Sequence, residues 1–250
     1  MQYENRIIAY IDILGFSEMI KKTVNEVQPK VAQEKLDALV SVISTIKKQM
    51  NTAVAKRVLM GSCCLTMFSD TVVLSLPKAE SAKVLAIFDV LKKLQVTMLT
   101  KGILLRGSVV QGKRGHTKEW SRGPALVNAY AGESKSAVYP RIVIDPRVTF
   151  LYLRENGVPL EKRRVKDEPK SFSEDFDGTF YIDYFNELEE LLKGEKKEHY
   201  RNKMEALIKK GLESKDTGIR MKYLWMRKKL KEALQIEEDV KNDTLYEISR

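Results

Sequence analysis

The sequence predicts an α+β protein in which a mixed sheet carries helices on one face and a helical appendage follows. Up to Asp145, short apolar runs rich in β-branched residues alternate with longer segments of helical periodicity. From Asn186 onward, helical periodicity dominates. We therefore expect one domain over residues 1–185 and a helical region over residues 186–250.

The first strand is predicted over residues 6–14, RIIAYIDIL, an apolar run that Gly15 ends. Ser17 is expected to cap the next helix, with Glu18 in its first turn. Pro29 interrupts the helical spacing, which then resumes. The resumed helix is expected to bury one stripe of apolar residues: Leu36, Leu39, Val40, Ile43 and Ile46.

A hairpin is expected next, because residues 57–76 form two apolar runs around Ser69 and Asp70, residue types that favour tight turns. A helix over residues 79–99 and a strand over residues 103–112 should follow. Beyond them the segment 113–123 is polar and is expected to be a loop.

Pro124 suits the first turn of a helix that runs to about residue 137. Strands over residues 141–145 and 179–185 should complete the sheet. The intervening segment 154–178 is charged and punctuated by Gly and Pro.

The charge of the chain is unevenly distributed. The net charge is +10, yet residues 151–250 carry 22 basic and 22 acidic side chains, so residues 1–150 carry 22 basic against 12 acidic. A basic half suits a polyphosphate ligand. The basic and apolar segment 220–234 is expected to be a packed amphipathic helix, so a nucleic-acid or membrane partner is not expected. The polar N-terminus does not resemble a signal peptide, which favours the cytoplasm.

Two aspartates have unusual settings. Asp12 is embedded in an apolar strand, where carboxylates are rare unless they are paired or bound to a metal, and Asp70 lies at the tip of an apolar hairpin. Neighbouring strands could bring the two carboxylates together, and a divalent cation would be their natural partner. The alternative is that Asp12 serves the start of the helix and Asp70 serves only the turn.

Four segments resemble motifs of the class III adenylate and guanylate cyclases, in the order in which that family has them. The first two, YIDILGFS (10–17) and LTMFSDTVVLSLP (65–77), are similar to its two metal motifs. The others, LLRGSVVQG (104–112) and GPALVNAY (123–130), are similar to its Arg-x-Gly strand and its Val-Asn helix. The resemblance implies a ferredoxin-like core, and usually a homodimer with active sites at the interface.

The resemblance also implies the site. Asp12 and Asp70, assisted by the Ile13 carbonyl, would hold two Mg²⁺ or Mn²⁺ ions per site. Backbone amides of residues 14–17 (Leu14, Gly15, Phe16 and Ser17) would cradle the triphosphate, as suits a helix N-terminus. Asn128 would be the asparagine of the Val-Asn helix. The implied reaction converts a nucleoside triphosphate to a 3′,5′-cyclic mononucleotide and pyrophosphate.

Two positions depart from the family pattern. Thr66 stands where purine cyclases carry the lysine that reads the base, and Gly132, beside Glu133, stands where they carry the arginine that stabilises the transition state. Either the chain is a silent nucleotide-binding module, or another arginine acts. The arginines available as replacements, each also able to serve only the fold or the surface, are Arg106, Arg122 and Arg141.

This pattern of departures resembles the cyclases of the bacterial Pycsar antiphage systems, which make cyclic CMP or cyclic UMP. Trp120 and Tyr130 flank the altered region and could stack on a base, although packing would explain them equally. A palm-type polymerase or a diguanylate-cyclase relative would share the two carboxylates. However, the hairpin reads Phe68-Ser69-Asp70 and not Gly-Gly-Asp/Glu-Glu-Phe.

Overall fold

The computed structural model describes residues 3–55, 63–78, 84–116, 121–155, 171–185 and 195–248. It confirms the predicted α+β class, with a mixed sheet and two C-terminal helices. The chain divides into two compact units, Met1–Ile182 and Asp183–Arg250.

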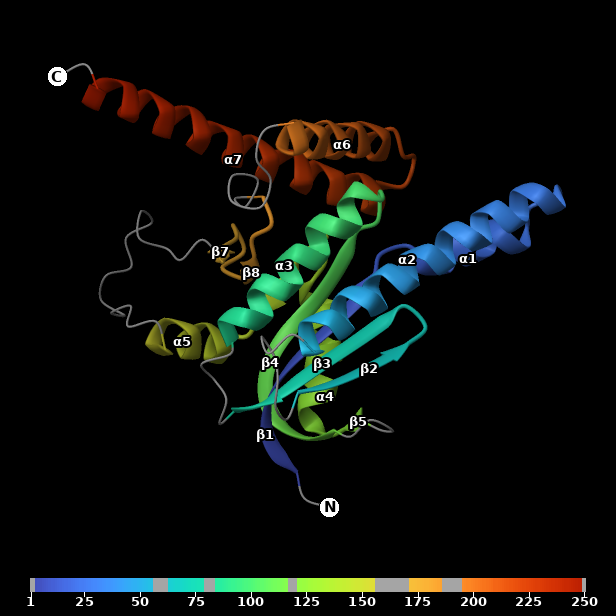
Figure 1. Ribbon diagram of the computed structural model, residues 1–250, viewed down its shortest axis with the longest axis horizontal. Coiled ribbons are helices and arrows are strands. Elements are labelled where there is room, and N and C mark those ends of the chain that lie inside the picture. Colours follow the sequence, from blue (N-terminus) through green and yellow to red (C-terminus); the bar gives the residue numbers. More distant parts are fainter. Residues whose placement is uncertain are drawn as a thin grey trace. The chain divides into compact units, whose positions relative to one another are not determined.

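The first unit begins with a ferredoxin-like core. Its elements in chain order are β1 (Glu4–Ile13), α1 (Phe16–Val24), α2 (Pro29–Ala55), β2 (Cys64–Phe68), β3 (Thr71–Pro77), α3 (Val84–Thr100) and β4 (Leu105–His116). β1 lies between β3 and β4 and is antiparallel to both, and β2 pairs with β3 (Figure 1). This strand order is that of a βαββαβ ferredoxin-like unit.

The sheet continues beyond β4. The further elements are β5 (Ser121–Arg122), α4 (Pro124–Ala131), a π-helical turn (Gly132–Ser136), β6 (Ile142–Ile144), α5 (Pro146–Glu155), β7 (Phe172–Glu174) and β8 (Phe180–Ile182). β6 pairs with β4 in parallel, and β8 and β7 follow antiparallel. Within the described residues the order is β2-β3-β1-β4-β6-β8-β7, with β5 paired to β4.

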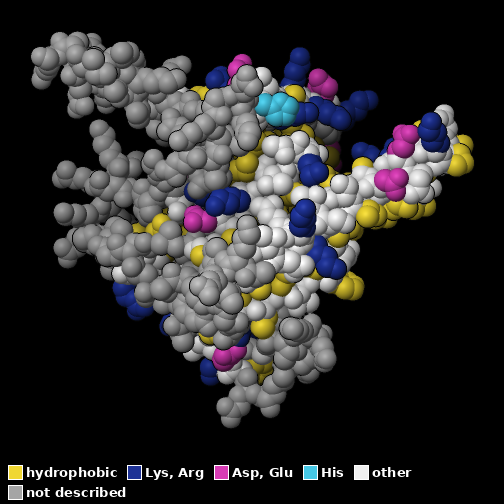
Figure 2. Space-filling view, in the orientation of Figure 1, with side chains coloured by type: hydrophobic (Ala, Val, Ile, Leu, Met, Phe, Trp, Pro, Cys, Tyr) yellow, Lys and Arg dark blue, Asp and Glu magenta, His cyan; other side chains and the backbone are white. Residues whose placement is uncertain are grey.

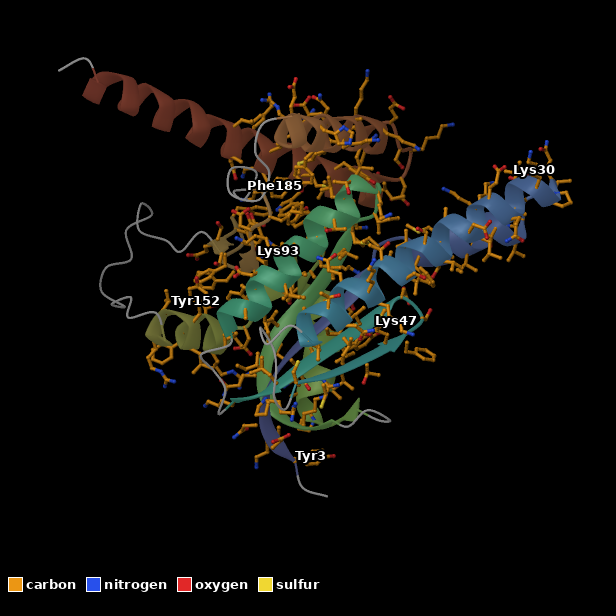
Figure 3. The ribbon with its side chains drawn as sticks, in the orientation of Figure 1. Tyr3, Lys30, Lys47, Lys93, Tyr152 and Phe185 are labelled. Atoms are coloured by element: carbon orange, nitrogen blue, oxygen red, sulfur yellow. The ribbon has the colours of Figure 1, made fainter. Side chains whose placement is uncertain are left out.

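The two faces of β1 divide the first unit into layers, because successive side chains of a strand point to opposite faces. Ile7, Ala9, Ile11 and Ile13 enter the main core beneath α2, α3 and α5. In that core, Tyr152 of α5, which is labelled in Figure 3, stacks on Phe88 of α3. The ring centroids are 5.3 Å apart.

The opposite face of β1 carries Ile8, Tyr10 and Asp12. α4 packs there through Ala125 and Ala129, both buried against Ile8. The predicted placement of helices on one face therefore holds for α2, α3 and α5 but not for α4. The small side chains of α4 allow its backbone to approach the sheet closely.

Three further expectations differ from the structure. β4 runs on to His116 and pairs with β5, so part of the polar segment predicted as a loop is a hairpin. α5 and β7 were not predicted, because their charged surroundings obscured the short apolar patterns. In α2 the buried residues include Leu39 and Ile46, whereas Leu36 and Val40 of the predicted stripe are exposed.

α1 and α2 lie side by side and project from the sheet (Figure 1). The space-filling view shows hydrophobic side chains along this projection (Figure 2). Val24 of α1, Val27 in the connection, and Leu36 and Val40 of α2 are among the exposed residues of this projection. The apolar stripe of α2 therefore contributes only some of its residues to the core.

The second unit contains α6 (Glu195–Leu212) and α7 (Thr217–Ile248), which pack together. Tyr200, Met204, Trp225 and Met226 are buried, and Phe185 meets the Trp225 ring edge to face. Within the described part of the chain, no helix has the length and apolar character needed to cross a membrane.

Candidate functional site

The site is built around the end of β1. Asp12 is the next-to-last residue of β1, opposite Arg106 of β4, on the face that α4 covers. Asp70 lies in the two-residue turn between β2 and β3, where Ser69 has a left-handed φ of 54°. Because β3 pairs with β1, the turn brings Asp70 to the end of β1.

The two carboxyl groups interact directly. Burial, a hydrogen bond with Asp70, and the negative charges of Asp70 and Glu133 raise the pKa of Asp12 to about 7, whereas the charge of Arg106 opposes the rise. The fold therefore juxtaposes two carboxylates 58 residues apart in sequence. At neutral pH the pair retains a proton part of the time.

Arg106 bridges two acidic side chains. Its Nε and Nη2 donate to Oδ2 of Asp12, each at 3.3 Å, and its Nε lies 2.5 Å from Oε1 of Glu133. A single N–H cannot point at both acceptors. The Nε–H is directed toward Asp12, so the buried Oε1 of Glu133 contacts the guanidinium at short range without a well-aligned hydrogen bond. Burial raises the pKa of Glu133, and the charge of Asp70 adds to the rise, whereas the charge and the side-chain contact of Arg106 oppose it.

The turn after α4 explains why Glu133 faces the site. Residues Gly132–Ser136 form a π-helical turn, a form that inserts an extra residue and rotates the following side chains. A Cβ atom on Gly132 would lie 3.0 Å from Cβ of Ser108, whose Oγ donates to the carbonyl of Ala129 at 2.6 Å. The backbone therefore has little room for a side chain at 132.

Sequence reasoning did not assign a role to Glu133 or to Tyr10. Tyr10 lies two residues before Asp12 and so on the same face of β1; its ring meets that of Tyr130 edge to face at 5.9 Å. The alternation of β1 could have identified Tyr10. Only the π-helical turn, which sequence periodicity does not indicate, brings Glu133 into the site.

The three residues predicted to contact a base have different settings. Thr66 of β2 is opposite Val73, which is opposite Tyr10, so Thr66 lies on the same face of the sheet. The Tyr130 side chain is 56% exposed on α4. Trp120 lies outside the described residues.

The start of α1 differs from prediction in two respects. Gly15, with φ 78°, is the N-cap and provides no side-chain cap, so Ser17 lies inside the helix and not at its cap. The Leu14 amide donates to the carbonyl of Leu104 at 2.9 Å, so it is not available to a phosphate. Ser17 is exposed, whereas Phe16 packs partly against the main core and Ile13 ends β1.

Asn128 is exposed on α4 and lines a cavity of about 390 Å³. Ser108, Gly132 and Arg147 also line this cavity. The structure thus places Asn128 in a hollow over β4 and β6, and does not show it against Asp12.

Arg141 has a fold-supporting environment. Its guanidinium is fully buried and ion-paired with Asp175 and Asp177, and its Nη2 also donates to the carbonyl of Ser136. These partners tie the start of β6 to the turn between β7 and β8. Of the predicted replacement arginines, Arg106 is the one that the structure places against Asp12, whereas only the backbone of Arg122 is described, in β5.

A divalent cation fits the two aspartates. Their juxtaposition leaves negative charge that a proton only partly neutralises, which is the setting in which a hard cation binds oxygen ligands. No group of three or more metal-ligating side chains occurs within the described residues. Mg²⁺ often has only one or two carboxylate ligands and completes its shell with water and substrate phosphates.

Solved structures of nucleotide cyclases are similar to this chain. The adenylyl cyclase CyaB from P. aeruginosa matches with a TM-score of 0.45 and 14% identity, over 62% of this chain and 82% of the other. The guanylyl cyclase domain of the RhoGC fusion protein from the aquatic fungus Blastocladiella emersonii matches with a TM-score of 0.48 and 12% identity, over 73% and 96%.

A third similar structure is the catalytic core of a rhodopsin-guanylyl cyclase with converted specificity, in complex with ATPalphaS. Its TM-score is 0.45 and its identity 14%, over 73% of this chain and 97% of the other. No protein-family model matches the sequence, and no curated protein matches it.

Proposed function

We propose that the chain is a nucleotidyl cyclase that converts a nucleoside triphosphate to a 3′,5′-cyclic mononucleotide and pyrophosphate. The observation that carries the proposal is the position of Asp70, in the turn between β2 and β3, beside Asp12 at the end of β1. The motifs around these residues suggest the type of reaction, because they resemble those of the class III cyclases, in which the same two positions hold metal ions.

Asp12, Asp70 and the Ile13 carbonyl would hold two Mg²⁺ or Mn²⁺ ions. When bound, these ions would lower the pKa of the attacking 3′-hydroxyl and neutralise charge on the triphosphate. The backbone at Gly15, Phe16 and Ser17 would orient the phosphates through the N-terminus of α1. Arg106, with five N–H donors, is the arginine placed to take up charge that develops near Asp12.

The proposed enzyme uses a pyrimidine nucleoside triphosphate. Its product is then cyclic UMP or cyclic CMP, as in antiphage signalling by Pycsar cyclases. Thr66 supports this, since it lacks the long cationic side chain with which purine cyclases read the base. Tyr130 offers an exposed ring for stacking beside the site.

We further propose that residues 1–185 form the catalytic domain of a cytoplasmic homodimer with active sites at the interface. Large apolar side chains are exposed on the α4 side of the sheet, beside the site. Phe68 at the hairpin tip is 81% exposed and Val127 on α4 is 66% exposed. Burial of such surface would favour association with a second copy.

The test is a product assay by mass spectrometry with each of the four nucleoside triphosphates, in the presence of Mg²⁺ or Mn²⁺. We expect cyclic product and pyrophosphate from UTP or CTP. Asp12→Asn and Asp70→Asn should each lower the rate at least about 10³-fold, because each removes a charged metal ligand. Asp37→Asn is the matched control, since Asp37 is an exposed aspartate of α2.

The same assay distinguishes a cyclase from the alternative functions. Metal-dependent triphosphate binding without any product would support a silent sensor, for which the small residue at 132 is the motivating feature. Linear or dinucleotide products would point to a polymerase-like relative. Absence of both binding and product with all four nucleotides would contradict the proposal.

A further inference from the structure

Arg106 lies between two acidic side chains, Asp12 and Glu133, and its hydrogen bonds to them differ. Asp12 is 17% exposed and accepts both of the hydrogen bonds that Arg106 makes to it. Glu133 is 3% exposed, and its buried Oε1 contacts Nε of Arg106 at 2.5 Å without a well-aligned hydrogen bond. A buried carboxylate oxygen without a well-aligned hydrogen bond is costly, so Oε1 of Glu133 can still accept one.

A divalent cation at Asp12 would compete with this guanidinium. Both are positive, and both need the oxygens of Asp12. Arg106 is 29% exposed and its long side chain can pivot, and the Glu133 carboxylate is already in contact at 2.5 Å. A small rotation would turn the Nε–H from Asp12 toward Glu133 and satisfy the buried oxygen.

We propose that Arg106 serves as the resident cation of the site and transfers from Asp12 to Glu133 when divalent cations bind. Glu133 is then a positioning residue that acts through Arg106, and it need not touch the cation. The inference rests on the proposed metal site at Asp12 and Asp70. It gives a role to the π-helical turn, which places the acid Glu133 against Arg106.

The experiment measures Mn²⁺ binding without nucleotide, by calorimetry at pH 8. Arg106→Gln should tighten binding about tenfold, because the competing cation is gone. Glu133→Gln should weaken binding about tenfold, because Arg106 keeps its place on Asp12. The double variant should bind like Arg106→Gln, within about twofold, since Glu133 acts only through Arg106.

Matched controls come from an exposed pair of the same types, Arg201 and Glu205 of α6. Arg201→Gln and Glu205→Gln should leave Mn²⁺ affinity unchanged. If Glu133→Gln weakens binding equally with and without Arg106, Glu133 is a direct ligand and the inference is wrong. If the wild-type protein binds no Mn²⁺, the proposed metal site fails first.

A second measurement follows Arg106 itself and tolerates a change in stability. The side-chain Nε–H signal of Arg106 in a ¹H–¹⁵N spectrum should shift as Mg²⁺ is added to the wild-type protein. In Glu133→Gln the same titration should move the signal much less. An unmoved signal in the wild-type protein at saturating Mg²⁺ would overturn the transfer.

Discussion

The carboxyl group of Asp12 holds its proton at a pH where an exposed aspartate has lost it. Its pKa in the folded protein is about 7, above the ordinary value of 3.8. Between these two values the native state binds more protons than the unfolded state. Without metal, the free energy of unfolding should therefore fall as pH rises from about 4 to 7, by at most about 1.4 kcal/mol per pH unit from this group.

Urea unfolding at a series of pH values in the presence of a chelator measures this dependence. Asp12→Asn should reduce the fall, and saturating Mg²⁺ should reduce it in the wild-type protein. Asp37→Asn, at an exposed position on α2, should leave the pH profile unchanged. A wild-type profile that is identical to that of Asp12→Asn would show that the pair does not share a proton.

Gly132 allows a second prediction at the residue scale. Replacing a helical glycine by alanine usually stabilises a helix by about 1 kcal/mol. Here Gly132→Ala should instead lower the free energy of unfolding by about 1–2 kcal/mol, because its Cβ would lie 3.0 Å from Ser108 Cβ. Thermal or urea unfolding measures the effect, and a Ser108→Gly background should relieve part of it. Stabilisation by Gly132→Ala in the wild-type background would contradict the packing argument.

The sequence was informative about residues wherever local pattern determines position. Asp12 and Asp70 could be predicted as neighbours because one ends an apolar strand and the other tips an apolar hairpin. The position of Glu133 could not be predicted, since it depends on a π-helical turn that sequence periodicity does not indicate. The engagement of the Leu14 amide likewise depends on a carbonyl 90 residues away in sequence.

At the scale of elements, the edge of the sheet depends on one buried cation. Arg141 joins the start of β6 to the turn between β7 and β8 through Asp175, which is fully buried, and Asp177, which is 36% exposed. Breaking a buried pair leaves an uncompensated charge, whereas an exposed partner contributes less. Asp175→Asn should therefore destabilise the protein by about 3 kcal/mol, and Asp177→Asn by about 1 kcal/mol or less.

Chemical unfolding of the two variants under identical conditions tests this ranking. The comparison is matched, because both substitutions remove one carboxylate from the same guanidinium. Equal losses would show that burial of Asp175 adds nothing. A larger loss for Asp177→Asn would contradict the account.

Long elements could be predicted from periodicity, and so could the short apolar strands β6 and β8, whereas β5, β7 and α5 could not. The main helices and the ferredoxin-like strands have patterns long enough to recognise. β7 has only three residues, and it is positioned by its pairing with β8, which in turn pairs with β6. β4 extends into a polar segment because β5 satisfies its backbone, a partner that residue type does not indicate.

At the scale of the whole molecule, the proposed homodimer makes a prediction about mass. Light scattering should give twice the mass of one chain, which is 28.7 kDa. Phe68→Asp and Val127→Asp place a charge on the exposed apolar face beside the site, and each should shift the protein toward monomer and lower activity.

Val27→Asp is the matched control for the dimer, because Val27 is 91% exposed after α1, away from that face. It should leave the mass unchanged. A wild-type protein that stays monomeric at micromolar concentration would contradict the dimer. Dissociation by Val27→Asp instead would assign association to the α1–α2 projection.

Three carboxylates and one guanidinium, those of Asp12, Asp70, Glu133 and Arg106, stand where a triphosphate would have to approach. The chain as a whole is basic, but at this point its field would repel a bare polyphosphate. Nucleotide would therefore enter together with its cations or after them. The free concentration of divalent cation in the surroundings, as much as the supply of nucleotide, would then decide how often the site is filled.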